Sequence, residues 1–367
     1  MIPGMGNEAE KDEMGTTEQL SLDRATVTRI DTSDQITDIL ALPEHLRDAL
    51  WKAESANLGS WDSPSGLVVA GMGGSGMGGL LARAILGDHA VRPILTTRDY
   101  GLPPWTTPDT TVLCTSYSGN TEEVLACYEA AGALGAHRVV ATTGGKLAKM
   151  ARKDGVPVIP MAGGLRSRAA IGYVTVAALE VAAACGAGPR VASDLDVASE
   201  HLEELVVAWG PDGPEDGPAK SLARALANTV PVIAGCGTTA PVAYRWKSQI
   251  NANAKRPAFA HELPELDHNE IQGWEGTDGL GPFSAVFFDD ADAHPRMSGR
   301  VELTRQLVEP HAASTHIVSS IGHTAAERVF SLVLLGDLVS LYLAVLRGKD
   351  PGPLPSVEQL KGELAAS

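Results

Sequence analysis

Short apolar runs and longer segments with helical spacing alternate along the first half of the chain. The runs predict strands at about 67–71, 93–97, 111–116, 138–142 and 157–160. The segments between them predict helices at about 76–87, 121–134 and 146–153. Short apolar strands separated by helices are typical of a parallel sheet covered on both faces. We therefore expect an α/β fold with a doubly wound parallel sheet.

Three further segments frame this pattern. Residues 36–58 carry apolar positions at helical spacing and predict a leading helix. The alanine-rich run 169–185 predicts a helix that closes the first unit. Residues 1–20 are polar and aperiodic, and we expect them to be disordered.

The same order of elements begins again in the second half. The sequence PVIAGCG at 231–237 echoes LVVAGMG at 67–73, and strands are predicted at about 230–235, 284–288 and 314–318. The repetition predicts two copies of one α/β unit, as doubly wound parallel-sheet domains in tandem. We place the first domain with its leading helix at 35–207, a linker rich in proline, glycine and acidic residues at 208–220, and the second domain with a C-terminal helix at 221–367.

One apolar run could be mistaken for a membrane span. Residues 329–345 are almost entirely apolar, but Asp337 lies in the middle and polar residues precede the run. A charge at the centre of a bilayer is costly, so a buried core helix is the better interpretation. The N-terminus has no basic segment followed by an apolar one, so we expect no signal peptide.

Composition narrows the classes of partner. The formal net charge of −16 argues against a nucleic-acid partner, which would select a basic face. The four cysteines are widely spaced, without a CxxC pair or a metal-ligand spacing, so we expect reduced, buried thiols, no metal and a cytoplasmic location.

Two loops carry the candidate chemistry, each where a strand hands over to a helix. The first is GMGGSGMGG at 71–79, and the second is SYSGNT at 116–121. Backbone amides, hydroxyls and two helix N-termini form a site for an anion on a neutral ligand, and the phosphate of a sugar is the natural candidate.

Each loop also has another interpretation. The first loop fits the dinucleotide fingerprint GxGxxG, which requires an acid at the end of the next strand, and Asp99 lies near that place with Arg98 before it. In the second loop, Thr121 or Asn120 could simply cap a helix. Capping explains one hydroxyl, whereas phosphate binding explains all three.

Six motifs occur in one order: GMGGSGMGG, SYSGNTEE, RAAIGY, RWKSQINANAK, ELPELDHNEI and a DPGP tail followed by Leu-Lys. Together they resemble the bifunctional phosphoglucose/phosphomannose isomerase family from about residue 35 to the C-terminus. The resemblance implies two sugar-isomerase (SIS) domains, a homodimer, and no metal or cofactor. It also implies reversible isomerisation of glucose 6-phosphate or mannose 6-phosphate to fructose 6-phosphate through an enediolate.

The resemblance assigns roles to individual residues. The phosphate ligands are Gly74, Ser75, Ser116, Ser118 and Thr121. Arg168 is similar to the arginine that steadies the enediolate, His268 to the histidine that opens the sugar ring from the neighbouring subunit, and Lys361 to the lysine at the ring oxygen. Without the resemblance, Arg168 could be a surface charge, His268 a cap or loop residue, and Lys361 a solvated side chain.

The chain departs from the family pattern at one position. The family's base, a glutamate between two asparagines, falls on Ala252 of this chain, and an alanine cannot carry a proton. One explanation is a substitute carboxylate at Glu262, Glu265 or Glu270. Another is a protein that binds a sugar phosphate without turning it over, and a third is a different substrate.

The favoured function is therefore a phosphosugar isomerase acting on a small-molecule sugar phosphate, with neither nucleic acid nor membrane as a partner. The alternative is a non-catalytic or regulatory phosphosugar-binding protein, because of Ala252. A more distant alternative is an NAD-dependent oxidoreductase that uses the glycine loop.

Overall fold

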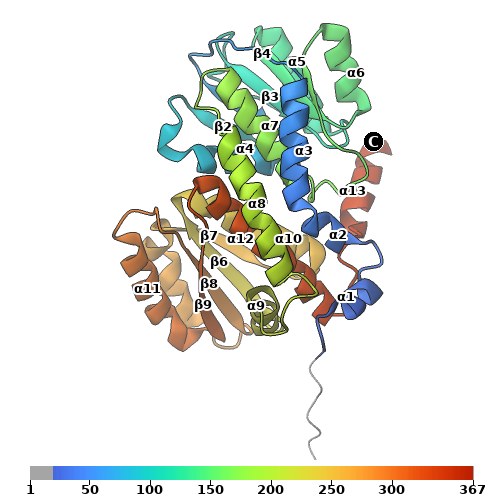
Figure 1. Ribbon diagram of the computed structural model, residues 1–367. Coiled ribbons are helices and arrows are strands. Elements are labelled where there is room, and N and C mark those ends of the chain that lie inside the picture. Colours follow the sequence, from blue (N-terminus) through green and yellow to red (C-terminus); the bar gives the residue numbers. More distant parts are fainter. Residues whose placement is uncertain (1–19, 367) are drawn as a thin grey trace, which may run out of the picture.

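The computed structural model describes residues 20–366, so nearly all of the segment predicted to be disordered, residues 1–20, lies outside the described residues. The chain forms two stacked units, each built on one parallel sheet (Figure 1). The first sheet has the order β2-β1-β3-β4-β5. Its strands are β1 (Leu67–Ala70), β2 (Ile94–Thr97), β3 (Thr111–Thr115), β4 (His137–Thr142) and β5 (Val158–Pro160). The predicted α/β class and the five predicted strands of this sheet are confirmed.

Helices cover both faces of the first sheet, because successive strand residues point to opposite sides. Leu67 and Val69 of β1 belong to one apolar core and Val68 and Ala70 to another. The first core packs on α3 (Leu42–Ser55), α4 (Gly73–Leu86) and α7 (Ile171–Ala184), and the second on α5 (Glu122–Leu134) and α6 (Gly145–Asp154).

The second sheet repeats the topology of the first. Its order is β7-β6-β8-β9, which corresponds to β2-β1-β3-β4. The strands are β6 (Val230–Cys236), β7 (Phe259–Leu263), β8 (Phe283–Asp289) and β9 (Ser314–Ser319), and the helices between and after them are α10 (Ala240–Asn253), α11 (Met297–Val308) and α12 (Ala325–Leu346). The predicted duplication is confirmed, although β7 is absent from the predicted strands.

Helix α12 is the central helix of the second domain. Within residues 20–366 it is the one helix long and apolar enough to cross a membrane, and 94% of its most apolar 18-residue window is buried inside the molecule. Asp337 pairs there with Arg245 of α10. The prediction of a buried core helix at 329–345 is therefore confirmed.

Several helices differ from the predicted ones. The leading helix is interrupted at Ala41, which separates α2 (Gln35–Leu40) from α3, and α1 (Arg24–Ile30) precedes both. Helix α8 (Ala192–Trp209) was not predicted, and it packs on both α3 and α12 along the two domains (Figure 1).

The segment predicted as a linker contains a surface loop that is held in place by hydrogen bonds from Lys220. Its ends belong to α8 and to α9 (Pro218–Leu226). Lys220 is 1% exposed, and its ammonium donates to the carbonyls of Pro211 and Gly213 and to the carboxylate of Glu215. The chain closes with α13 (Pro355–Ala366), and short 3₁₀ helices occur at η1 (Gly87–His89), η2 (Gly237–Thr239), η3 (Glu265–His268), η4 (Glu270–Gly276) and η5 (Glu309–His311).

Candidate functional site

The glycine-rich loop after β1 becomes the first turn of α4. The helix begins at Gly73, which has a positive φ of 52°. Gly74 packs closely on the segment before α7: an added Cβ would lie 2.9 Å from the carbonyl oxygen of Ser167 and 3.1 Å from the Cα of Arg168. A glycine is needed there, because a side chain would push the helix N-terminus away from Arg168. The positive end of the α4 dipole therefore lies beside this arginine.

The second loop folds its hydroxyls toward one another. Ser116 is 1% exposed, its Oγ lies 2.8 Å from the Thr121 Oγ1, and it accepts a hydrogen bond from the Gly119 amide at 3.1 Å. Thr121 occupies the N-cap of α5, yet its side chain makes no capping bond. The amide of Tyr117 donates to the Ser75 Oγ at 3.3 Å, which joins the two loops. Simple capping therefore does not describe this loop.

Tyr117 also connects the second loop to the segment that leads to Arg168. Its phenol donates to the Ala162 carbonyl at 3.0 Å and accepts from the Leu165 amide at 2.7 Å. Ser118, the remaining predicted ligand, is exposed, and its hydroxyl accepts from the Asn120 amide at 3.2 Å. The five predicted phosphate ligands thus lie on two loops that are in contact.

Arg168 lies before α7 and is 8% exposed, so it is not a surface charge. Its Nε donates to the Asn253 Oδ1 at 2.7 Å, and its Nη2 donates to the carbonyls of Pro351 and Gly352 at 2.7 and 2.9 Å. Burial and the charge of Arg166 lower the pKa of Arg168 to about 10, so the guanidinium stays charged at neutral pH. A cation held in this way can stabilise an oxyanion as it develops.

A buried ion pair supports the backbone of Arg168. Arg245 donates to the Arg168 carbonyl at 3.0 Å, and its guanidinium meets the carboxylate of Asp337 at 2.5 and 3.1 Å. Gln249 donates to the same carboxylate at 2.8 Å. Asp337, the charged residue within the apolar run of α12, therefore positions α10 against Arg168.

The end of α10 carries the position of the implied base. Ala252 supplies only a methyl group, and its carbonyl accepts from the Lys255 Nζ at 2.7 Å. The same ammonium donates to the Pro351 carbonyl at 3.0 Å, which Arg168 also contacts. Burial, followed by the charges of Arg168 and Arg166, lowers the pKa of Lys255 to about 8. A lysine therefore lies beside the place where the resemblance implies a carboxylate.

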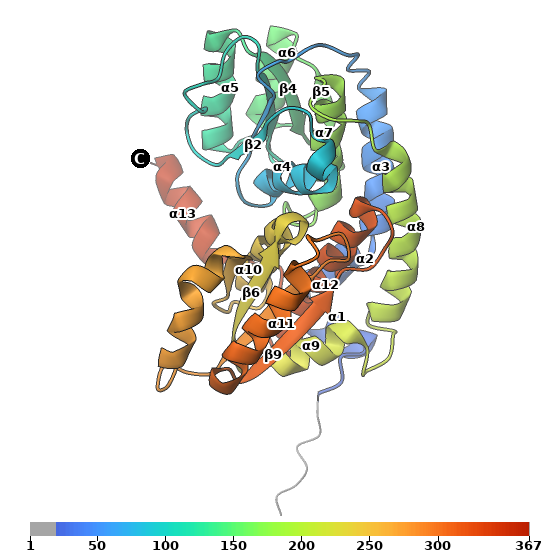
Figure 2. The same cartoon turned by 90° about the vertical axis from the view of Figure 1, so that its left-hand side faces the viewer.

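His268 and Lys361 lie on other parts of the second domain. His268 is exposed at the end of η3, which packs on β7 and η4 and is joined to α11 by Asp267 through Arg300 at 2.7 Å. Lys361 is exposed on α13, which projects from the molecule in Figure 2. Within the described chain, neither residue shares a hydrogen bond or ion pair with Arg168.

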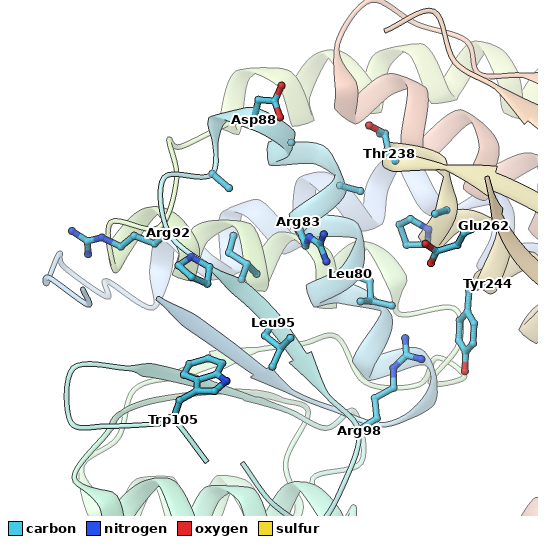
Figure 3. Close-up of a pocket in the computed structure, with 18 residues that line it drawn as sticks. Leu80, Arg83, Asp88, Arg92, Leu95, Arg98, Trp105, Thr238, Tyr244 and Glu262 are labelled. Carbon is cyan, nitrogen blue, oxygen red and sulfur yellow. The ribbon is translucent and has the colours of Figure 1, made fainter. Parts of the chain in front are cut away.

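A large cavity lies between the domains at the start of α10 (Figure 3). It has a volume of about 870 Å³, and its lining includes Arg83, Arg98, Tyr244 and Glu262. The Arg98 guanidinium lies over the Tyr244 ring, 4.5 Å from its centroid. Arg98 also borders the glycine loop, because a Cβ added at Gly76 would lie 3.4 Å from its Nε. This cation next to the phosphate loops was not anticipated.

The three substitute carboxylates lie on or after β7. Glu262 borders the cavity, Glu265 accepts from the Asn269 amide group at 2.9 Å, and Glu270 pairs with His261. Because α10 runs back along the sheet from β6 to β7, the carboxyl end of β7 lies near the start of α10. Ala252 is at the other end of this 14-residue helix, roughly 15–20 Å away along its axis. Within one chain, these carboxylates are therefore distant from the base position.

All four cysteines, Cys114, Cys127, Cys185 and Cys236, are free and buried, as predicted. Across residues 20–366, no three His, Cys, Asp or Glu side chains gather in a way that could hold a metal ion.

Four residues near the site were missing from the sequence-based set: Tyr117, Asn253, Lys255 and Arg98. Tyr117 and Asn253 lie inside motifs that carry the resemblance, so their positions in the sequence could have indicated that they belong to the site. Their contacts could not be predicted, because they involve residues distant in sequence. The position of Lys255 could also have indicated a place in the site, because this lysine ends the motif RWKSQINANAK.

Residues 215–364 match the model of the bacterial phospho-glucose isomerase C-terminal SIS domain. Over 329 residues the chain is 40% identical to the bifunctional phosphoglucose/phosphomannose isomerase of Caldicellulosiruptor bescii, covering 88% of this chain and 97% of the relative. A protein of the same name from Aquifex aeolicus is 34% identical over 300 residues, covering 82% and 90%.

Solved structures agree on the architecture. A hypothetical protein from Thermus thermophilus superposes with a TM-score of 0.71 at 16% identity, over 93% of both chains. A glucose-6-phosphate isomerase like protein from the same organism gives 0.59 at 20% identity, over 93% of this chain and 98% of the other. At these identities, the likeness shows the fold alone.

Proposed function

This chain belongs to the family of bifunctional phosphoglucose/phosphomannose isomerases, and we propose that it interconverts glucose 6-phosphate and mannose 6-phosphate with fructose 6-phosphate. The observation that carries the proposal is the contact of two glycine- and hydroxyl-rich loops beside the buried Arg168. The family argues against the NAD-dependent oxidoreductase, which used only the first of these loops.

The sugar phosphate binds between the loops. Ser75 and the α4 N-terminus hold it from one side, and Ser116, Ser118 and Thr121 hold it from the other. Oriented amides and hydroxyls provide this attraction in a chain of net charge −16. The open-chain sugar then extends from the phosphate toward Arg168, whose guanidinium stabilises the negative charge on the enediolate.

The active form is a cytoplasmic homodimer. His268, exposed on η3, opens the sugar ring in the partner's site, because an imidazole can donate and accept a proton near neutral pH. Lys361 assists at the ring oxygen. The exposure of η3 and α13 supports roles in which these residues reach a site outside their own surroundings.

The second candidate function is binding of a sugar phosphate without turnover. It is favoured by one observation, the alanine at position 252 where the family's base falls. Losing a positioned general base costs about 10²–10⁴ in rate. Binding would survive that loss, because the phosphate loops and Arg168 do not depend on position 252.

Coupled assays with glucose 6-phosphate and mannose 6-phosphate, together with melting curves, distinguish these functions. We expect fructose 6-phosphate to form, and Arg168→Met to lower kcat at least about 100-fold, as removal of an oxyanion partner does. Stabilisation by sugar phosphates without turnover, with activity appearing in Ala252→Glu, would instead identify a binding protein. Stabilisation by NAD alone would contradict the phosphate site.

A further inference from the structure

The position of Lys255 gives the site a group that can carry a proton. Its Nζ contacts two carbonyl oxygens, those of Ala252 at 2.7 Å and Pro351 at 3.0 Å. The Pro351 carbonyl also accepts from the Nη2 of Arg168 at 2.7 Å, so the two cations share one acceptor. The lysine therefore lies next to the guanidinium that the proposed function places at the enediolate, and one of its two backbone contacts is with Ala252, at the position of the implied base.

The two carbonyls fit the neutral amine. An uncharged amine nitrogen has two N–H groups and one lone pair, whereas an ammonium has three N–H donors and no lone pair. When both N–H groups donate to the carbonyls, the remaining direction of the nitrogen is the lone pair. These two contacts hold the nitrogen in place and leave its lone pair outside both hydrogen bonds.

We propose that Lys255 takes over the proton transfer between C1 and C2 of the sugar, in place of the carboxylate that Ala252 removes. This inference rests on the proposed isomerase function. The fixed nitrogen, the shared carbonyl and the proximity of Arg168 carry it.

The charges around Lys255 change the fraction of neutral amine that is present near neutral pH. Arg166 and Arg168 face it from the segment before α7 and lower its pKa, and Asp350 after α12 raises it. Arg256 is the next residue, and Arg347 at the end of α12 donates to the Lys255 carbonyl at 3.3 Å. Burial is the largest effect, and the resulting pKa of about 8 provides a useful fraction of free base at physiological pH.

The step balances without any other reactant. In the aldose-to-ketose direction, the amine takes the proton from C2, and the C2–H electron pair forms the C1–C2 double bond while the carbonyl pair moves onto O1. Arg168 stabilises that oxyanion. The ammonium then returns the proton to C1, the O2 proton passes to O1, and the carbonyl forms at C2. A proton moves from C2 to C1 with no net oxidation.

Lys255→Arg separates this role from a structural one. Arginine can still donate to both carbonyls, but it cannot release a proton in this pH range. We expect its melting temperature to match that of the wild type and its dissociation constant for fructose 6-phosphate to stay within about twofold, while kcat falls about 10²–10⁴-fold. Lys247→Arg, on α10 shortly before Lys255, is the matched control and should keep the wild-type kcat.

Three further readouts test base catalysis directly. The wild-type kcat/KM should rise with pH through an apparent pKa near 8. Methylamine added to Lys255→Ala should restore part of the activity. The double variant Ala252→Glu with Lys255→Arg should recover activity, with its pH profile displaced toward acid because a carboxylate then carries the proton.

Two results would overturn the inference, and they are distinguishable. A wild-type enzyme that isomerises, with Lys255→Arg keeping kcat within threefold, would remove the role of Lys255 and leave the proposed function intact. A wild-type protein that neither isomerises nor exchanges the C2 proton of glucose 6-phosphate with deuterium from D₂O would overturn both.

Discussion

The buried ion pair between Arg245 and Asp337 permits a quantitative test of how the second domain supports the site. The guanidinium and the carboxylate are 2% and 6% exposed, and their atoms approach to 2.5 and 3.1 Å. Asp337→Asn keeps the shape of the side chain but removes its charge. Arg245 then remains buried without an opposite charge, and such a loss costs about 3–5 kcal/mol.

This loss is a large part of a typical free energy of unfolding of 5–15 kcal/mol. Urea unfolding at pH 7 should therefore show a lower midpoint with an unchanged m-value. Asp212→Asn is the matched control. It breaks a pair with Arg24 whose side chains are 67% and 48% exposed and screened by water, so its urea midpoint should stay close to that of the wild type.

A double variant tests the physical reason. Replacing both partners, as Arg245→Met with Asp337→Leu, removes the unpaired charge, so this protein should be more stable than Asp337→Asn alone. A loss below about 1 kcal/mol in Asp337→Asn, or a double variant less stable than the single one, would refute the reasoning.

Three other changes test the loops and the start of α12. Ser116→Ala should weaken fructose 6-phosphate binding about 10- to 100-fold by isothermal titration calorimetry, because a hydrogen bond to a charged group is lost. Tyr117→Phe leaves the Leu165 amide without its phenol acceptor and should lower the free energy of unfolding by about 1–3 kcal/mol in urea. The pKa of Glu327 is about 2, because hydrogen bonds led by that of the Thr324 amide outweigh its burial. The ionised carboxylate therefore stabilises the fold above pH 4.5, and this contribution disappears as the pH falls toward 2. Melting curves should show the wild type losing its advantage over Glu327→Gln across that range.

The hydrophobic pattern of short segments was sufficient to predict much of the fold. Strands β1 and β3 of the first sheet are short apolar runs buried on both faces, so their hydrophobicity alone revealed them. Strand β7 was not predicted because it is an edge strand in which the polar residues His261 and Glu262 interrupt the apolar pattern. Helix α8 was not predicted, because its apolar face is recognisable only when α3 and α12 are seen to pack against it.

The two loops that we propose bind the phosphate were also predicted from local sequence. Glycines and hydroxyls at a strand-to-helix junction predict oriented amides whatever the rest of the chain does. The sequence alone also established that Ala252 cannot carry a proton. These conclusions need only residue type and spacing, because the chemistry lies within a few consecutive residues.

Only the tertiary structure decided what surrounds Arg168 and Lys255. Asn253 at the end of α10 and Pro351 after α12 lie far from Arg168 in the chain, and they meet it because the two domains pack together. Burial in that junction lowers the pKa of the lysine, and no property of the isolated segment would do so. Long-range packing sets the local dielectric and the neighbouring charges, and these determine which side chain can act as a base.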